Sequence, residues 1–267
     1  MLTLDNAVQH FFHCEMSDFI VERSCVPELH QLDSEIVLQN LNAKYVQLYC
    51  PKDFDVSSLA NIKINEQHRR CNNEKKGGGT KIFLYCNKAP RALRLNNAQN
   101  HNIFILSETI NVSLDLHRSC NIIFGQYTTV MGMRISGGNA SLAIKKGSLI
   151  SDNVLCQLGD QHKIFSTLDG SICNGFDNFR HYEIGIHSWL GRGVTVIKPQ
   201  ITDNVILGAG CVLAKICRPF SIYAGNPAKL ISEDKSFLGG NIPYELEKSI
   251  IMELYKKYSY NGKVAVS

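Results

Sequence analysis

The stretch IGIHSWLGRGVTVIKPQITDNVILGAGCVLAKICRPFSIYAGNPAKLI (184–231) decides the fold of this chain. Aliphatic residues recur in it every six positions. The two runs are Ile184, Leu190, Val196 and Ile201, Leu207, Leu213. A period of six is neither the 3.6-residue period of an α-helix nor the two-residue period of a strand. It predicts a short strand followed by a tight turn, repeated many times.

The same period extends upstream through Ile144, Ile150 and Cys156, and its next step falls on His162. The fourth residue after most of these positions is small or β-branched, as at Ser148, Val154, Ser188, Val194, Val205 and Cys211. Stacked coils of this kind enclose a column of aliphatic side chains. We therefore predict a mainly β chain with a parallel β-helix over 96–232. An ordinary β-sandwich is disfavoured, because its strands do not keep one short period.

The segments on either side of the repeat region do not show the six-residue period. Residues 1–95 mix helical runs with the strand-like segments 45–50 and 81–86, and they predict an N-terminal α/β domain. Because an uncovered coil exposes strand edges and apolar core, we expect this region to cap the helix and to assist acceptor binding. Docking of a glycosyltransferase is the alternative role. At the other end, apolar residues recur every four positions within 241–258. They predict an amphipathic helix in a C-terminal extension over 233–267.

Composition narrows the class of protein. The chain has 267 residues, a net charge of +4, and 44% apolar and 19% charged residues. This balance favours a packed globular protein over a dedicated nucleic-acid binder. The sequence contains no apolar run long enough to span a membrane and no export signal, so we expect a cytoplasmic protein. The ten cysteines show no CxxC pair, which favours buried free thiols. The glycine-rich stretch 69–81 lacks the order of a phosphate-binding loop and predicts a solvated loop.

Three motifs of the repeat region resemble the hexapeptide-repeat acyltransferases. They are IGIHSWLG (184–191), LGAGCVLAK (207–215) and YAGNPAKLI (223–231). GDQHKIFSTLDG (159–170) is similar to the segment that carries the catalytic histidine in that family. The coils over 139–154 look most like the branch that modifies bacterial capsules and other surface polysaccharides.

The resemblance implies a left-handed parallel β-helix, although parallel crossovers are otherwise right-handed. It also implies a homotrimer whose active sites lie between subunits and take acetyl-CoA. The sequence departs from the family pattern at one coil, where Val196 and Ile201 are five positions apart. Gln200 and Thr202 stand there in place of small residues.

His162 is the strongest candidate for a catalytic residue. A neutral imidazole can remove the proton of an alcohol near neutral pH, as acyl transfer to a hydroxyl requires. Asp160, two positions earlier, could orient the imidazole. The resemblance adds Trp189, the only tryptophan, beside the thioester of the acyl donor. None of the cysteines lies in a recognisable Cys–His nucleophile motif, so we expect direct transfer without an acyl-enzyme.

The resemblance also implies a coenzyme A groove. Its candidate residues are Trp189, Arg192, Ala209, Ala214, Lys215, Arg218 and Lys229. The backbone N–H of Ala209 would meet the pantetheine arm. The three cations Lys215, Arg218 and Lys229 would meet the phosphates. A solvated surface is the alternative interpretation of each basic residue.

The predicted function is transfer of an acetyl group from acetyl-CoA to a hydroxyl of a sugar, in a capsular or other surface polysaccharide. Alternatives are N-acetylation of an amino sugar on a nucleotide carrier, acetylation of an antibiotic, and a non-catalytic β-helix scaffold. His162, His181 and His187 could together suggest zinc. Their spacing does not match the prism-shaped carbonic anhydrases, and in the family the position of His187 usually faces solvent. We therefore expect no metal.

Overall fold

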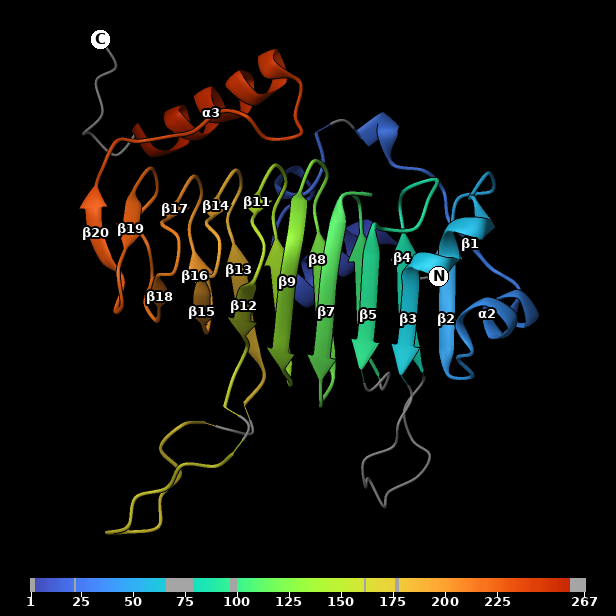
Figure 1. Ribbon diagram of the computed structural model, residues 1–267, viewed down its shortest axis with the longest axis horizontal. Helices are drawn as coiled ribbons and strands as arrows, with labels where there is room; N and C mark the ends of the chain where they lie inside the picture. The colour runs from blue at the N-terminus through green and yellow to red at the C-terminus, as the bar shows by residue number, and fades with distance from the viewer. Residues whose placement is uncertain are drawn as a thin grey trace.

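The computed structural model describes residues 3–21, 23–65, 79–96, 100–160, 162–175 and 178–259. Most of the predicted glycine-rich loop at 69–81 lies outside these residues. Within them the chain winds into a long β-helix, with helices at one end and along its sides (Figure 1).

The strands form two sheets. The first sheet has eight strands, which are β1 (His30–Gln31), β2 (Val46–Cys50), β4 (Thr80–Leu84), β6 (Asn102–Ile105), β8 (Cys120–Phe124), β10 (Ala140–Ile144), β13 (Arg180–Ile184) and β16 (Gln200–Ile201). All neighbours in it pair in parallel except β1 and β2.

The second sheet has twelve strands and covers the two remaining faces. They are β3 (Ile62–Asn65), β5 (Ala92–Asn96), β7 (Ile110–Leu116), β9 (Thr129–Gly137), β11 (Leu149–Ile150), β12 (Val154–Gln157), β14 (Trp189–Leu190), β15 (Thr195–Ile197), β17 (Ile206–Leu207), β18 (Val212–Leu213), β19 (Ile222–Ala224) and β20 (Lys229–Ser232). β9 joins the two faces, because its first residues pair with β11 and its later ones with β12.

The predicted left-handed parallel β-helix is confirmed. The last three complete coils each contribute one strand to the first sheet and two to the second, whereas each earlier coil contributes one strand to each sheet. The residues of the six-residue period are buried in one core: Ile144, Ile150, Cys156, Ile184, Leu190, Val196, Ile201, Leu207 and Leu213. The shortened coil keeps its register, since Ile184 still pairs with Ile201. Lys198 closes its corner with a φ of 54°.

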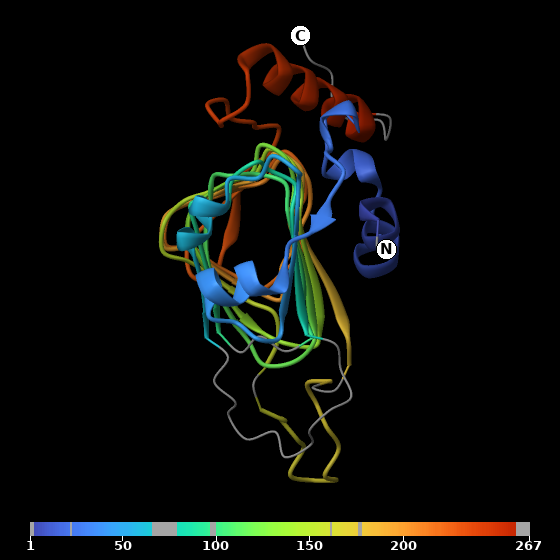
Figure 2. The ribbon, with the colours of Figure 1, turned by 90° about the vertical axis from the view of Figure 1, so that its right-hand side faces the viewer.

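Three edges separate the faces, and we name them by what covers them. The α3 edge contains the corners 185–188 and 202–205, and α3 (Tyr244–Ser259) lies along it. The second edge contains the corners 191–193 and 208–211. The excursion edge contains 198–199 and the long insertion 158–179 between β12 and β13. Viewed along the helix axis, α3 and the insertion lie at opposite sides of the coil (Figure 2).

The sheets continue across the boundary predicted at residue 95. β2 and β4 are the strands expected at 45–50 and 81–86, and β4 pairs in parallel with β6. β3, β5 and β7 make the matching ladder on the other side. The coils therefore begin at β2. The sequence obscures them because the chain between β3 and β4 interrupts the six-residue spacing.

The remaining N-terminal elements cover the helix in two places. α2 (Ser34–Leu41) packs Val37 and Leu41 into the main core beside the first coil, which agrees with the expected capping. The other elements are α1 (Leu4–Ala7), η1 (Val8–Phe12), η2 (Met16–Asp18), η3 (Arg23–Cys25) and η4 (Val56–Asn61). Residues 4–20 pack on the outer side of the first sheet, where Phe12 and Phe19 join Phe104 in a second apolar cluster.

The C-terminal helix is the amphipathic helix expected at 241–258. Ile250 and Leu254 are buried against Ile186 and Phe220 of the β-helix. At one end of α3, Lys257 and Tyr258 contact the buried carboxylate of Asp203, at 2.9 and 2.8 Å. Among the described helices, none has the length and apolarity needed to cross a bilayer.

Candidate active site

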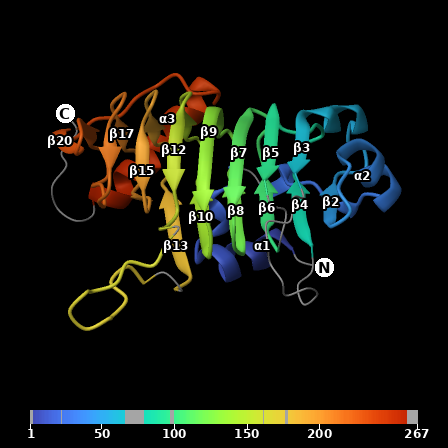
Figure 3. The same ribbon diagram turned by 60° about the horizontal axis from the view of Figure 1, so that its bottom comes forward.

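The insertion leaves the coil between β12 and β13 (Figure 3). His162 lies near the start of this insertion. The insertion folds back on itself, with Phe165 bridged to Ile172 and the amide of Cys173 donating to the carbonyl of Ile164 at 2.7 Å. His162 is exposed at the base of this excursion. Asn174 Nδ2 donates to its backbone carbonyl at 2.8 Å, so the returning strand of the excursion fixes the backbone that carries the imidazole.

Asp160 contributes to the same base. Its Oδ2 accepts hydrogen bonds from Lys198 Nζ and from Asn174 Nδ2, each at 3.1 Å. Asn174 thus bridges Asp160 and the carbonyl of His162. The connection between Asp160 and His162 runs through the backbone, and Lys198 and Asn174 are members of the site that the sequence did not single out.

Trp189 opens β14, on the face that follows the α3 edge. It is 36% exposed, and its Nε1 lies 3.4 Å from Ser151 Oγ. The ring of Phe237, from the segment before α3, lies 5.6 Å from the indole at an angle of 49°. Phe237 carries no repeat signal, so only the folded chain reveals this neighbour.

A single chain does not bring His162 and Trp189 together. The excursion leaves the coil between β12 and β13, whereas Trp189 follows the corner at the other end of β13. Figures 1 and 2 agree that the excursion lies on the side away from α3. Trp189 contacts Phe237, which belongs to the segment that leads into α3. Two of the predicted catalytic residues therefore lie on different sides of the chain.

His187 is buried, and the expectation that this position faces solvent is wrong. Its corner has a φ of 52°, a left-handed conformation that histidine tolerates better than most residues. Nδ1 lies 3.0 Å from Asn204 Oδ1, and Nε2 lies 3.0 Å from Glu247 Oε1 of α3. Burial alone would raise the pKa of Glu247, but hydrogen bonds from His187 and from the amides of Gly239 and Gly240 lower it overall.

His181 lies on the first sheet, beside the N-terminal segment. Its Nδ1 is 2.7 Å from Ser141 Oγ, and its Nε2 is 3.1 Å from Nε2 of His13. Burial and the neighbouring His13 lower the pKa of His181. The structure thus places His162, His181 and His187 in three separate surroundings. Within the described residues, no group of three or more His, Cys, Asp or Glu is arranged to hold a metal.

The predicted coenzyme A residues follow successive coils towards β20. Arg192 Nε pairs with Asp152 at 2.8 Å, and Arg218 pairs with Glu233 at 3.0 Å. Lys215 Nζ lies 5.2 Å from the centre of the Tyr223 ring. Lys229 is on β20 opposite Ala224. The four cations Arg192, Lys215, Arg218 and Lys229 are exposed. The cations thus lie near the C-terminal end of the β-helix, although several contact partners within the chain.

Ala209 and Ala214 are exposed at the ends of β17 and β18. Ala209 lies one coil beyond Gly191. A Cβ added at Gly191 would lie 2.8 Å from the backbone nitrogen of Ala209. Glycine at 191 thus permits the close stacking of coils at the second edge. Ala209 and Arg192 occupy this same edge, because the amide of Gly210 donates to the carbonyl of Arg192.

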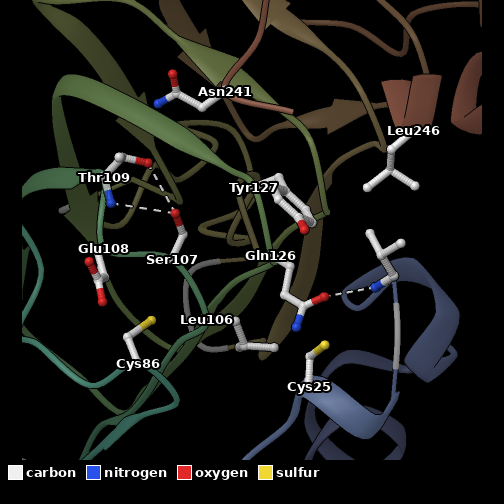
Figure 4. A pocket seen from close by; sticks show the side chains of 11 residues that line it. Cys25, Cys86, Leu106, Ser107, Glu108, Thr109, Gln126, Tyr127, Asn241 and Leu246 are labelled. Atoms are coloured by element: carbon white, nitrogen blue, oxygen red, sulfur yellow. Dashed lines mark hydrogen bonds between the residues drawn. The ribbon is translucent and has the colours of Figure 1, made fainter. Parts of the chain in front are cut away.

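A cavity of about 380 Å³ lies at the α3 edge of the earlier coils (Figure 4). Its lining residues are Val21, Cys25, Cys86, Leu106, Ser107, Glu108, Thr109, Gln126, Tyr127, Asn241 and Leu246. Ser107 and Thr109 both donate to the carbonyl of Thr128, and Gln126 accepts from the amide of Val21. The contact of Val21 joins the N-terminal segment to the coils, and the other two link neighbouring coils. The lining includes none of the predicted site residues.

Comparisons with known proteins bear on the fold of the chain and on its class of activity. No known family profile matches the sequence. A probable macrolide acetyltransferase of Lysinibacillus sphaericus is 41% identical over 52 residues, which are 19% of this chain and 28% of that protein. The match therefore spans less than a third of that relative.

Among solved structures, the polysialic-acid-specific acetyltransferase NeuO superposes with a TM-score of 0.52 at 18% identity, covering 73% of this chain and 87% of NeuO. The polysialic acid O-acetyltransferase OatWY gives a TM-score of 0.41 at 23% identity, covering 66% and 79%. The superposition on NeuO and the parallel strand pairing show that the chain has the β-helix fold, as its motifs predicted.

Proposed function

We propose that this protein is an O-acetyltransferase that moves an acetyl group from acetyl-CoA to a hydroxyl of a sugar in a surface polysaccharide. The observation that carries the proposal is the placement of His162 at the base of an excursion from a hexapeptide β-helix. There its imidazole is accessible to an acceptor, while Asn174 and Asp160 hold the backbone. The similarity to a macrolide acetyltransferase supports acetyl transfer, and the polysialic acid enzymes suggest a glycan acceptor.

In the proposed mechanism, neutral His162 removes the proton of the acceptor hydroxyl as the oxygen attacks the thioester carbonyl. The new C–O bond forms, and the carbonyl oxygen takes the negative charge until the C–S bond breaks. The imidazolium then gives its proton to the leaving thiolate. The proton removed from the acceptor thus ends on the thiol of coenzyme A, and no covalent acyl-enzyme forms.

The separation of His162 from Trp189 suggests an active site shared between two copies of the chain. The excursion of one copy would bring its His162 to the Trp189 face of the next, in the homotrimer that the resemblance implies. The excursion also exposes Ile164, Phe165 and Leu168, apolar side chains that a neighbouring copy could cover.

The coenzyme would lie along the later coils. Arg192 and Arg218 are engaged in exposed ion pairs, which contribute little stability and can open in exchange for phosphate. Lys215 and Lys229 are exposed near the same end of the β-helix. A cofactor phosphate would gain charge-assisted hydrogen bonds from these cations.

The test is thiol release from acetyl-CoA in the presence of bacterial glycans, with the wild-type protein, His162→Ala and His117→Ala. His117 is an exposed histidine on another part of the helix and serves as a matched control. We expect release with a hydroxyl acceptor to fall at least about 100-fold in His162→Ala and to be unchanged in His117→Ala. Release that survives in His162→Ala would refute the assignment of the base. Release that requires an amino sugar would favour N-acetylation.

A further inference from the structure

The segment between β20 and α3 places an aromatic ring between two rings of the β-helix. Phe237 stacks on His187, with ring centres 4.2 Å apart and planes 13° from parallel. Its other neighbour is Trp189, at 5.6 Å. Phe237 therefore connects a buried histidine at the α3 edge to the tryptophan of the candidate donor site.

The buried side of this stack is tightly held. His187 is 0% exposed and Glu247 is 2% exposed. The His187 ring contacts Asn204 through one nitrogen and Glu247 through the other. Because both nitrogens have partners, the plane of the imidazole is fixed, and it forms a rigid platform for the ring of Phe237.

The same two partners also hold the backbone on each side of Phe237. Before it, Ser236 Oγ donates to Asn204 Oδ1 at 3.0 Å. After it, the amides of Gly239 and Gly240 donate to the carboxylate of Glu247 at 3.1 and 3.2 Å. Asn204 and Glu247 thus fix both the platform and the turn that places the ring upon it.

Trp189 has fewer restraints of its own. Its indole is partly exposed, and its hydrogen bond to Ser151 is long, at 3.4 Å. An aromatic neighbour at this distance and tilt favours one orientation of the ring. The packing of Phe237 is therefore the contact best placed to select the rotamer of Trp189.

We propose that Phe237 is a positioning residue that holds Trp189 in the orientation required by the acyl donor, and that His187 and Glu247 hold Phe237. This inference rests on the proposed function for the role of Trp189 at the donor. It makes the C-terminal extension part of the donor site, in addition to its role as a cover for one edge of the β-helix.

Trp189 is the only tryptophan, so its fluorescence reports on this contact directly. The variants are Phe237→Leu, which removes the ring, and Phe237→Tyr, which keeps it. Tyr244→Leu is the matched control, because it removes an exposed ring from the start of α3. Emission and collisional quenching would be measured without substrate, followed by KM for acetyl-CoA and kcat.

For Phe237→Leu we expect red-shifted emission and easier quenching, with KM for acetyl-CoA raised about two- to tenfold and a smaller change in kcat. Phe237→Tyr should restore both readouts, and Tyr244→Leu should resemble the wild type. Unchanged emission in a folded Phe237→Leu protein would overturn the inference, as would equal effects in Tyr244→Leu.

Two further measurements keep the test decisive. Glu247→Gln leaves Phe237 in place but weakens its support, and it should shift the emission in the same direction even if Phe237→Leu fails to fold. Titration of the wild type with acetyl-CoA examines the proposed function separately. An emission shift in Phe237→Leu without any response of Trp189 to acetyl-CoA would confirm the packing but refute the role at the donor.

Discussion

The α3 edge and the excursion edge belong to the same coils but have opposite surroundings. At the α3 edge, α3 buries His187 and Glu247, and it reaches the carboxylate of Asp203. At the excursion edge, the chain extends away from the coils and leaves His162 exposed, with Leu168 97% exposed beyond it. The same residue type thus serves packing at one edge and is available for proton transfer at the other.

The six-residue repeat therefore specifies where the corners of the coil occur, but it does not specify which segment covers them. At the α3 edge this chain supplies the cover itself, and polar side chains there need partners because water is excluded. At the excursion edge, apolar side chains of the described residues stay exposed to solvent. The following predictions test the contrast between these two edges and the packing of the N-terminal segment on the sheet between them, beginning with the largest expected effect.

Replacing Glu247 with Ala should strongly destabilise the α3 edge. The change removes the partner of His187 and the acceptor for two backbone amides, all in a buried place. Breaking such a buried pair costs about 3 kcal/mol in the free energy of unfolding. Urea denaturation would measure the loss, with Glu245→Ala as control, since Glu245 is exposed and pairs only loosely with Lys248. Equal stability of the two variants would contradict the burial of Glu247 and His187 at this edge.

The N-terminal segment should loosen as the solution becomes acidic. The folded chain lowers the pKa of His181, so the unfolded chain binds a proton at a higher pH than the folded chain does. The contribution of His181 is therefore complete above its ordinary pKa of about 6.5 and declines as the pH falls below that value. Thermal unfolding between roughly pH 5 and 8 should show this decline, and His181→Gln should flatten it. An identical pH profile in the variant would exclude His181 as the cause.

Replacing Leu168 with Ser should have the smallest effect on the isolated chain. Because this side chain is 97% exposed at the tip of the excursion, the free energy of unfolding should change by less than about 0.5 kcal/mol. Chemical denaturation of dilute protein would check this value. A large loss of stability would show that the excursion is packed in solution, and the contrast between the two edges would then disappear.

Much of the β-helix follows from local spacing. The period that links Ile184, Leu190 and Val196 predicted a buried column, and these residues are buried in the structure. The six-residue step also reaches His162, and the chain leaves the coil in this region, between β12 and β13. Such features are predictable because the position of a residue within one coil decides whether it points into the core or lies at a corner. Distant segments do not change this position.

Other features depend on segments that are distant in sequence. The sequence treated residues 1–95 as a separate region, whereas β2 and β4 continue the first sheet. It placed the position of His187 in solvent, but Glu247 of α3, 60 positions later, buries it. Asp160 was expected to orient the imidazole of His162, and the structure connects it to the backbone through Asn174.

Local spacing in the sequence was thus enough to predict the coil, its core column, the step of the repeat that carries His162 and the amphipathic C-terminal helix. Only the folded chain shows which edge this helix covers, that Phe237 lies between His187 and Trp189, and that α3 and the insertion that carries His162 lie on opposite sides of the coil. The physical reason is that periodic burial is a local property of each coil. The cover of an edge depends on how far separate segments reach and on which polar groups they can satisfy.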